Sequence, residues 1–439
     1  MSYNDCIRIS LGLKDHNINF EKKFCEEKKI KGLNSVVYFA TLTYRPTHCR
    51  CCGIVNEGFA VVKNGFLTSH IKWLNASHQP TYIRLKKQRF LCRECQATFV
   101  ATSPEIEADC FIANRVKQSI AIELGDAVSL KDLGRRHGVS PTTISRILAQ
   151  LGTDYQTNFN SLPSHLCFDE FKSVKNVEGK MSFIYYDAVH HKIIDILPDR
   201  RKEVLINHFS RYSVAARKSV KTIVVDMNAA YFSLVADLFP NAEVIIDRFH
   251  LIQLLSRSLN QTRIQVMKKY FTSNNEDMKN YRKLKRYWRL MLKSSTELDY
   301  QQYLYQRLFK KPIPETDIID YLISLDPTLK ATYEVYQELL YYSKQNDFIH
   351  FKAAINSLKP EVSSTMTTSL KTLKKHLPRI RNTFKYPYSN GPLEGIINKI
   401  KVIKRVAYGY RSFWNFKHRI FVSFKLNKKC SSTCLDKAA

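Results

Sequence analysis

The sequence predicts an α/β domain that is interrupted by a long helical segment and preceded by two smaller modules. Three observations support this prediction. Residues 219–250 have the pattern of a strand, a helix and a second strand, because a β-branched run at 222–225 is followed by apolar residues at helical spacing and then by a short run at 244–246. Two Cys-x-x-Cys pairs lie near the N-terminus, and the residues from 249 to about 376 show no strand pattern.

The composition favours a polyanionic partner. The chain has 439 residues, an apolar fraction of 44% and a formal net charge of +30, and its length suggests several domains of roughly 150 residues each. A basic excess of this size is typical of nucleic-acid-binding proteins. A membrane surface is the alternative, but we find no lipidation motif and no apolar run near the roughly 18 residues of a membrane span. The N-terminus has no signal-peptide core, so we expect a cytoplasmic protein.

Two cysteine pairs predict one structural Zn²⁺ in an N-terminal module that we place at residues 1–108. The four cysteines are Cys49, Cys52, Cys92 and Cys95. Two Cys-x-x-Cys pairs can supply the four sulfur ligands of a tetrahedral zinc ion. The interval between the pairs is longer than in most zinc ribbons. Free buried thiols therefore remain an alternative, and Cys51 or His48 could replace one of the four ligands.

Residues 109–152 have the form of a helix-turn-helix. A short helix is followed by a turn at Gly138 and by a second helix, for which Ser140 is a good N-cap and Pro141 suits the first helical position. The apolar side chains expected to pack inward are Val139, Ile144, Ile147 and Leu148. The polar side chains expected to face DNA are Arg135, Arg136, Thr142, Thr143, Ser145 and Arg146. An ordinary helical hairpin is the alternative.

Residues 163–265 have the element order of an RNase H-like sheet. Three strands, of which the second and third form a hairpin, precede a helix and the strand–helix–strand unit. In such a sheet the first strand lies beside the fourth, so Asp169 and Asp226 are expected to approach each other. Asp226 and Asp247 each follow a strand and also fit helix caps. Glu170 adjoins Asp169, but strand alternation predicts that it lies on the opposite face.

An all-helical insertion is expected at residues 266–385, followed by a closing helix within 386–425 that completes the core. Glu394 falls in the first turn of that helix. The residues that share its face, or adjoin that face, are Asn398, Lys401, Lys404 and Arg405. An acidic side chain on the same helix face as cationic side chains suits a site that binds both metal ions and phosphate groups. An acid in a first turn also interacts favourably with the helix dipole, which is the simpler explanation of Glu394 alone.

In combination these residues resemble the ISL-three group of bacterial insertion-sequence transposases, within the DDE superfamily. The similarity runs through nearly the whole chain. Its most specific motifs are FDEF, VVDMNAAY, IIDRFH and SNGPLEGIINKIKVIKRVAYGYRSF. The resemblance implies an RNase H-like catalytic core with a triad formed by Asp169, Asp226 and Glu394. The family's first cysteine pair usually encloses a proline, whereas this chain has Arg50 and Cys51 there.

The resemblance also implies a metal-dependent mechanism. Carboxylates brought together repel one another unless cations neutralise them, so we expect two Mg²⁺ or Mn²⁺ ions at the triad. Asp247 and His250 are expected to support the site. The implied function is a transposase that binds terminal inverted repeats and target DNA as a homodimer or higher homo-oligomer. A non-catalytic regulator and a nuclease that only hydrolyses DNA are the alternatives.

Overall fold

The computed structural model describes residues 3–357 and 360–430, which form two compact units. The N-terminal unit contains the residues up to Gln156, Val174–Asn176 and those from Lys399 onward. The core unit contains Thr157–Ser173 and Val177–Asn398. Within the described ranges, no helix is long and apolar enough to cross a membrane.

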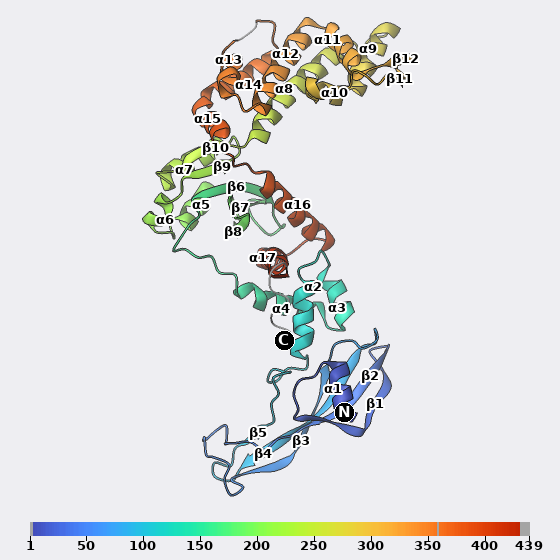
Figure 1. The fold of residues 1–439 in the computed structure, drawn as a ribbon, viewed down its shortest axis with the longest axis vertical. Helices are drawn as coiled ribbons and strands as arrows, with labels where there is room; N and C mark the ends of the chain where they lie inside the picture. Colours follow the sequence, from blue (N-terminus) through green and yellow to red (C-terminus); the bar gives the residue numbers. More distant parts are fainter. Residues whose placement is uncertain (1–2, 358–359, 431–439) are drawn as a thin grey trace. The chain divides into compact units, whose positions relative to one another are not determined.

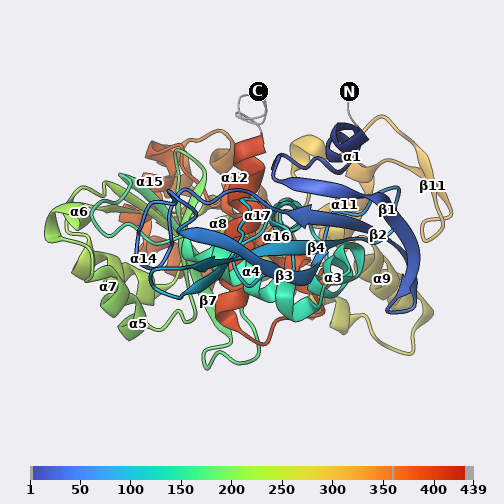
Figure 2. The ribbon, with the colours of Figure 1, turned by 90° about the horizontal axis from the view of Figure 1, so that it is seen from below.

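A twisted sheet forms the first part of the N-terminal unit (Figures 1 and 2), with strand order β1-β2-β4-β3 and β5 paired to β4. Its elements are α1 (Tyr3–Leu11), β1 (Ile18–Ile30), β2 (Leu33–Leu42), β3 (Val61–Lys72), β4 (Thr81–Cys92) and β5 (Thr98–Val100). The fully buried Trp73 donates its ring N–H to the carbonyl of Leu11 at 2.9 Å, which fixes α1 against the sheet.

Four helices complete the described part of this unit. They are α2 (Asn114–Glu123), α3 (Leu130–His137), α4 (Pro141–Thr153) and α17 (Phe413–Cys430). Gly138 ends α3 with a left-handed φ of 65°, and Ser140 caps α4 by accepting a hydrogen bond from the Thr143 N–H at 3.1 Å. The helix boundaries therefore fall where the sequence predicts them. Ile144, Ile147 and Leu148 are buried as expected, while Val139 is partly buried.

The contact between α17 and α4 was not expected from the sequence. Arg419 of α17 is buried and donates to the carbonyls of Asp126 and Val128, at 2.6 and 2.9 Å. These bonds tie the end of the chain to the loop between α2 and α3. The segment expected at 386–425 thus divides, because α17 packs in the N-terminal unit.

The core unit is built on a mixed sheet with strand order β10-β9-β6-β7-β8. Its strands are β6 (His165–Lys172), β7 (Met181–Asp187), β8 (Lys192–Leu197), β9 (Thr222–Val225) and β10 (Glu243–Ile246). The helices between them are α5 (Lys202–Phe209), α6 (Val214–Lys218) and α7 (Ala229–Leu238). β7 and β8 form the expected antiparallel hairpin. β6 lies at the centre, parallel to β9, which is the adjacency that the element order predicts.

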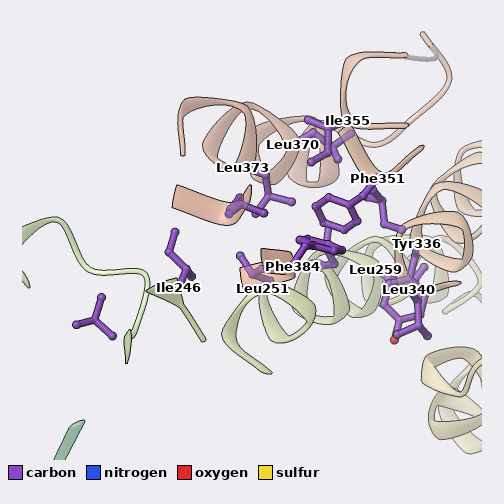
Figure 3. Close-up of a cluster of buried hydrophobic side chains, with 14 of the residues drawn as sticks. Ile246, Leu251, Leu259, Tyr336, Leu340, Phe351, Ile355, Leu370, Leu373 and Phe384 are labelled. Atoms are coloured by element: carbon purple, nitrogen blue, oxygen red, sulfur yellow. The ribbon is translucent and has the colours of Figure 1, made fainter. Parts of the chain in front are cut away.

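The insertion is mainly helical and packs on α8 (Arg248–Lys269), which continues from β10. Figure 3 shows Leu251 and Leu259 of α8 among side chains that include Tyr336 and Leu370. The other helical elements of the insertion are α9 (Asn275–Arg286), α10 (Trp288–Leu292), the 3₁₀ turn η1 (Ser295–Glu297), α11 (Glu315–Ser324), α12 (Pro327–Lys344), α13 (Phe348–Asn356), α14 (Ser364–Lys375) and α15 (Leu377–Lys385). α16 (Gly391–Val406) follows the insertion.

The prediction of an all-helical insertion is wrong in one place. β11 (Leu304–Gln306) and β12 (Lys311–Ile313) form a short antiparallel hairpin. Each strand has only three residues, which is too short for a period-two pattern to show in the sequence. The turn between them includes Lys310 with a φ of 55°.

Candidate functional site

Two acids lie beside each other in the core unit. The pairing of β6 with β9 places His165 opposite Thr222 and Cys167 opposite Val224. The same register, continued by two residues, places Asp169 opposite Asp226. Because neighbouring strands are about 4.8 Å apart, the two carboxylates reach the same space at the end of β9.

The electrostatics of both acids show that their environment disfavours ionisation. Burial raises the pKa of Asp169 to about 7, opposed by a hydrogen bond from the Glu170 N–H and reinforced by the charge of Asp226. Burial also raises the pKa of Asp226 to about 7, reinforced by the charges of Asp247 and Glu170. Oδ1 of Asp226 is buried and accepts no hydrogen bond from any described residue. Such a pair is stabilised by a proton or by a cation.

Asp247 and His250 lie beside Asp226. Nδ1 of His250 is 3.2 Å from Oδ1 of Asp226 and 3.6 Å from Oδ2 of Asp247, although the contact with Asp226 lacks hydrogen-bond geometry. Neither acid caps a helix: α7 is capped by Asn228, and the Asp247 side chain makes no capping bond to α8. The simpler explanation of these acids as helix caps therefore does not hold.

The first turn of α16 is tied to this edge of the sheet. The backbone N–H of Asn390 donates to Oδ1 of Asp247 at 3.0 Å, and the Asn390 side chain donates to the carbonyl of Phe168 at 3.2 Å. Figure 1 shows the start of α16 beside β6. Glu394 follows one turn later, with an exposed side chain that makes no hydrogen bond or ion pair with either aspartate among the described residues. The structure thus places Asp169 beside Asp226 and ties the start of the helix of Glu394 to this edge of the sheet.

A pocket of about 480 Å³ opens beside Asp226. Its polar lining residues are Glu170, Arg200, Asp226, Asn228, His250, Gln253 and Arg257. Glu170 accepts hydrogen bonds from Tyr231 and Arg200. Glu170, which we expected on the opposite face from Asp169, thus reaches the pocket that Asp226 lines, whereas Asp169 is not among the lining residues. No pattern in the sequence distinguished Tyr231, Arg200 and Asn390 from ordinary helix, loop and cap residues.

The zinc prediction is confirmed as a convergent cysteine cluster. The ligand atoms of Cys49, Cys52, Cys92 and Cys95 all lie within 4.8 Å of one another. Sγ of Cys49 is 3.7 Å from that of Cys95, and Sγ of Cys52 is 3.8 Å from that of Cys92. Zinc–sulfur bonds of about 2.3 Å in a tetrahedron give sulfur–sulfur distances of about 3.8 Å, so the cluster fits Zn²⁺. His48 and the exposed Cys51 lie outside the cluster, which removes the uncertainty about the ligands.

The cysteine cluster also has electrostatics that suit a cation. Backbone N–H groups of Cys52 and Cys51 lower the pKa of Cys49 to about 6. A backbone hydrogen bond from Ala97 lowers the pKa of Cys95, but burial and the neighbouring sulfurs raise it to about 12. Without a metal, the negative charge of one thiolate thus disfavours ionisation of the neighbouring thiols. A divalent cation bound to the sulfurs removes this repulsion.

The candidate DNA-binding residues differ in accessibility. On α3, Arg135 and Arg136 are exposed and pair with Asp132 and Glu123. On α4, Thr142 and Arg146 are exposed, whereas Thr143 and Ser145 are partly buried. On α16, Asn398, Lys401 and Arg405 are exposed, and Lys404 is partly buried. Ser145 accepts a long hydrogen bond from Asn415 at 3.4 Å, so it contributes to the packing of α17. Their roles remain predictions.

Comparison with known proteins agrees with a modular protein that carries a zinc ribbon. A family model described as transposase, of the ISL3 type (the ISL-three group), matches residues 166–420. A model of the zinc finger of transposases IS204, IS1001, IS1096 and IS1165 matches residues 45–95. The chain therefore belongs to the ISL3 family of transposases.

Two curated relatives match parts of the chain. A transposase for insertion sequence element IS1001 from Bordetella parapertussis is 26% identical over 60% of this chain and 62% of its own length. A protein from Lactococcus lactis subsp. lactis named ATP-dependent protease is 45% identical over 27% of this chain and 38% of its own length. The chain thus spans less than two thirds of either relative, and the protease name describes that protein alone.

Proposed function

We propose that this protein is a DNA transposase that binds the terminal inverted repeats of an insertion sequence and cuts and joins DNA strands there. The observation that carries this proposal is the partly buried pair of Asp169 and Asp226, both with pKa values raised to about 7. The Asn390 contacts hold the start of α16, the helix that carries Glu394, at the same edge, which supports a role for Glu394. Family membership supplies the class of chemistry, and we assign the core to the RNase H-like fold on its strand order.

Two Mg²⁺ or Mn²⁺ ions fit this site. The fit rests on the buried Oδ1 of Asp226, which lacks a partner among the described residues, and on the mutual repulsion of the acids. Asp169, Asp226 and Glu394 would hold the ions through hard carboxylate oxygens. Bound there, the ions would activate water or a DNA 3′-hydroxyl and stabilise the leaving oxygen.

The remaining pocket residues have roles that follow from their contacts. His250, at 3.2 Å from Asp226 and 3.6 Å from Asp247, restrains both carboxylates. Arg200 and Arg257 line the pocket as cations and suit the binding of DNA phosphates next to the acids. Glu170 and Tyr231 are joined by a hydrogen bond, and Glu170 also orients Arg200.

We assign end recognition to the N-terminal unit. α3 and α4 would act as a helix-turn-helix, with Arg146 and Thr142 toward the bases and the basic excess on phosphates. α16 would add Asn398, Lys401, Lys404 and Arg405 near the cut strand. We expect a homodimer or higher homo-oligomer on DNA, and a location at the bacterial nucleoid.

The test is Mg²⁺-dependent cleavage and joining of DNA that carries the element's ends. Asp226→Asn keeps the shape of the side chain but removes the charge that holds a cation, so cleavage should fall by several orders of magnitude while DNA affinity is retained. Glu394→Gln should behave in the same way.

Glu170→Gln is the matched control. Its carboxylate is already bound by Arg200 and Tyr231, so cleavage should stay within about tenfold of the unmodified protein. Near-normal cleavage by the Asp226→Asn protein would contradict the enzyme assignment and favour a DNA-binding regulator. Cleavage without strand joining would identify a nuclease.

A further inference from the structure

The β11–β12 hairpin presents aromatic side chains to solvent, away from the acid pocket. Tyr303 and Tyr305 are 64% and 68% exposed, and the neighbouring Tyr300 is 67% exposed. Neither Tyr303 nor Tyr305 makes a ring contact or a side-chain hydrogen bond within the described part of the chain. Other tyrosines of the insertion, such as Tyr287, Tyr333 and Tyr336, are buried instead. Large rings left in water indicate a surface that another molecule covers.

The register of the hairpin places the two rings on one face. Tyr305 lies opposite Pro312, and both side chains are exposed. Leu304 lies opposite Ile313; Ile313 is 5% exposed and packs in the core, while Leu304 is 59% exposed. The face that holds Tyr305 and Pro312 is therefore open to solvent. Side chains alternate along an extended chain, so Tyr303, two residues before Tyr305, shares that outer face.

The spacing of the rings suits one nucleobase. Residues two apart in a strand are separated by about 6.7 Å. Stacked bases repeat at about 3.4 Å, so a planar base between two rings needs about twice that distance. A base can thus enter between Tyr303 and Tyr305 without a change in the backbone.

The charge of the hairpin selects a nucleic acid over an apolar partner. Arg307, Lys310 and Lys311 are exposed in and beside the turn. No aspartate or glutamate occurs between residues 300 and 314. Interleaved aromatic rings and cations are the pattern by which proteins hold unpaired strands, with stacking for the bases and cations for the phosphates. Inside a duplex both faces of a base are covered by the neighbouring base pairs, so the rings would favour an unpaired strand over intact duplex.

We propose that the β11–β12 hairpin binds unpaired DNA, with one base stacked between Tyr303 and Tyr305 and the adjoining phosphates on Arg307 and Lys310. The inference rests on the proposed function only for the source of the strand, since cutting at an element end exposes unpaired bases. Binding itself does not require the acid pair. The hairpin would hold a strand end while the core acts on it.

The experiment compares a fluorescent single strand with a duplex of the same sequence, using the full-length Asp226→Asn protein without divalent ions. Replacing both Tyr303 and Tyr305 by Leu keeps apolar area but removes the rings, and should weaken single-strand binding by about tenfold or more while duplex affinity stays within about twofold. A 2-aminopurine in the strand should lose its stacking-dependent quenching. Replacing both by Phe should preserve binding, because Phe keeps the ring face.

Tyr341→Leu is the matched control, since Tyr341 is a half-exposed tyrosine of α12 in the same insertion. It should leave both affinities unchanged. Equal loss of single-strand and duplex binding, or no loss of either, overturns the proposal. A change in oligomeric state without loss of single-strand affinity also overturns it, because the hairpin is then a contact between copies. The triad is tested separately by cleavage, so failure of either proposal leaves the other standing.

Discussion

The backbone N–H of Asn390 donates a hydrogen bond to Oδ1 of Asp247 at 3.0 Å. The side chain of the same residue donates to the carbonyl of Phe168, which immediately precedes Asp169. Asn390, which is buried just before α16, thus links β6 to the acid that follows β10, although both lie far from it in the sequence. These bonds hold the start of α16, the helix that carries Glu394, at the acid-bearing edge of the sheet.

Asn390→Ala tests whether this link positions Glu394. The substitution leaves the carbonyl of Phe168 without its donor, so the free energy of unfolding should fall by about 1–3 kcal/mol. Cleavage should fall by more than the stability loss explains at a temperature where the variant is folded. Ser389→Ala is the control, because Ser389 is exposed and its hydroxyl accepts only a long bond of 3.4 Å from Gly391. Normal cleavage by folded Asn390→Ala protein would show that α16 is held by other contacts.

Zinc analysis should give about one Zn²⁺ per chain, as a single tetrahedral cysteine site requires. Cys92→Ser should abolish zinc binding and unfold the N-terminal module, because Cys92 is buried at the end of β4 and is one of the four clustered cysteines. Cys51→Ser should retain full zinc content, since Cys51 is exposed and outside the cluster. The measurement is elemental analysis after gel filtration. Full zinc in the Cys92→Ser protein would refute the four-cysteine assignment.

The stability of the metal-free protein should depend on pH through the acid pair. Both pKa values are raised to about 7 in the folded state, so the native protein holds protons that the unfolded chain releases above about pH 4. The resulting destabilisation is absent below pH 4 and complete above pH 7, and the free energy of unfolding should fall as pH rises through that window.

Asp226→Asn should flatten this part of the pH profile, as followed by thermal denaturation. Mg²⁺ or Mn²⁺ should raise the melting temperature more at about pH 8 than at about pH 5, because protons compete with the metal for the carboxylates. An equal rise at both values would indicate metal binding elsewhere on the protein.

Arg146→Ala should erode discrimination between terminal-repeat DNA and random DNA, by about 1–3 kcal/mol if the guanidinium reads a base. Arg135→Ala is the matched control, because an arginine on phosphate weakens binding to both DNAs alike and reduces the salt dependence. The measurement is a titration of both DNAs over a range of salt concentrations. Discrimination that survives Arg146→Ala and deletion of residues 129–151 would place recognition elsewhere.

Local patterns in the sequence predicted the local structure well. The β-branched run became β9, Ser140 caps α4, and the cysteine pairs form the zinc cluster. These features depend on the conformational preferences of residues that lie only a few positions apart in the sequence. The acids of the candidate site were likewise identifiable by their places after strands and in a first helical turn.

Only the tertiary structure decided which distant groups meet. It placed Cys51 outside the zinc cluster, directed Glu170 into the pocket with Asp226, and placed Asp226 and Asp247 beside His250 without the helix-capping bonds that were the alternative. It also packed α17 on α4 and formed the β11–β12 hairpin from strands too short to show a pattern. Each outcome depends on pairing and burial between segments far apart in the chain, where many partners are compatible with the same local preferences and packing selects one.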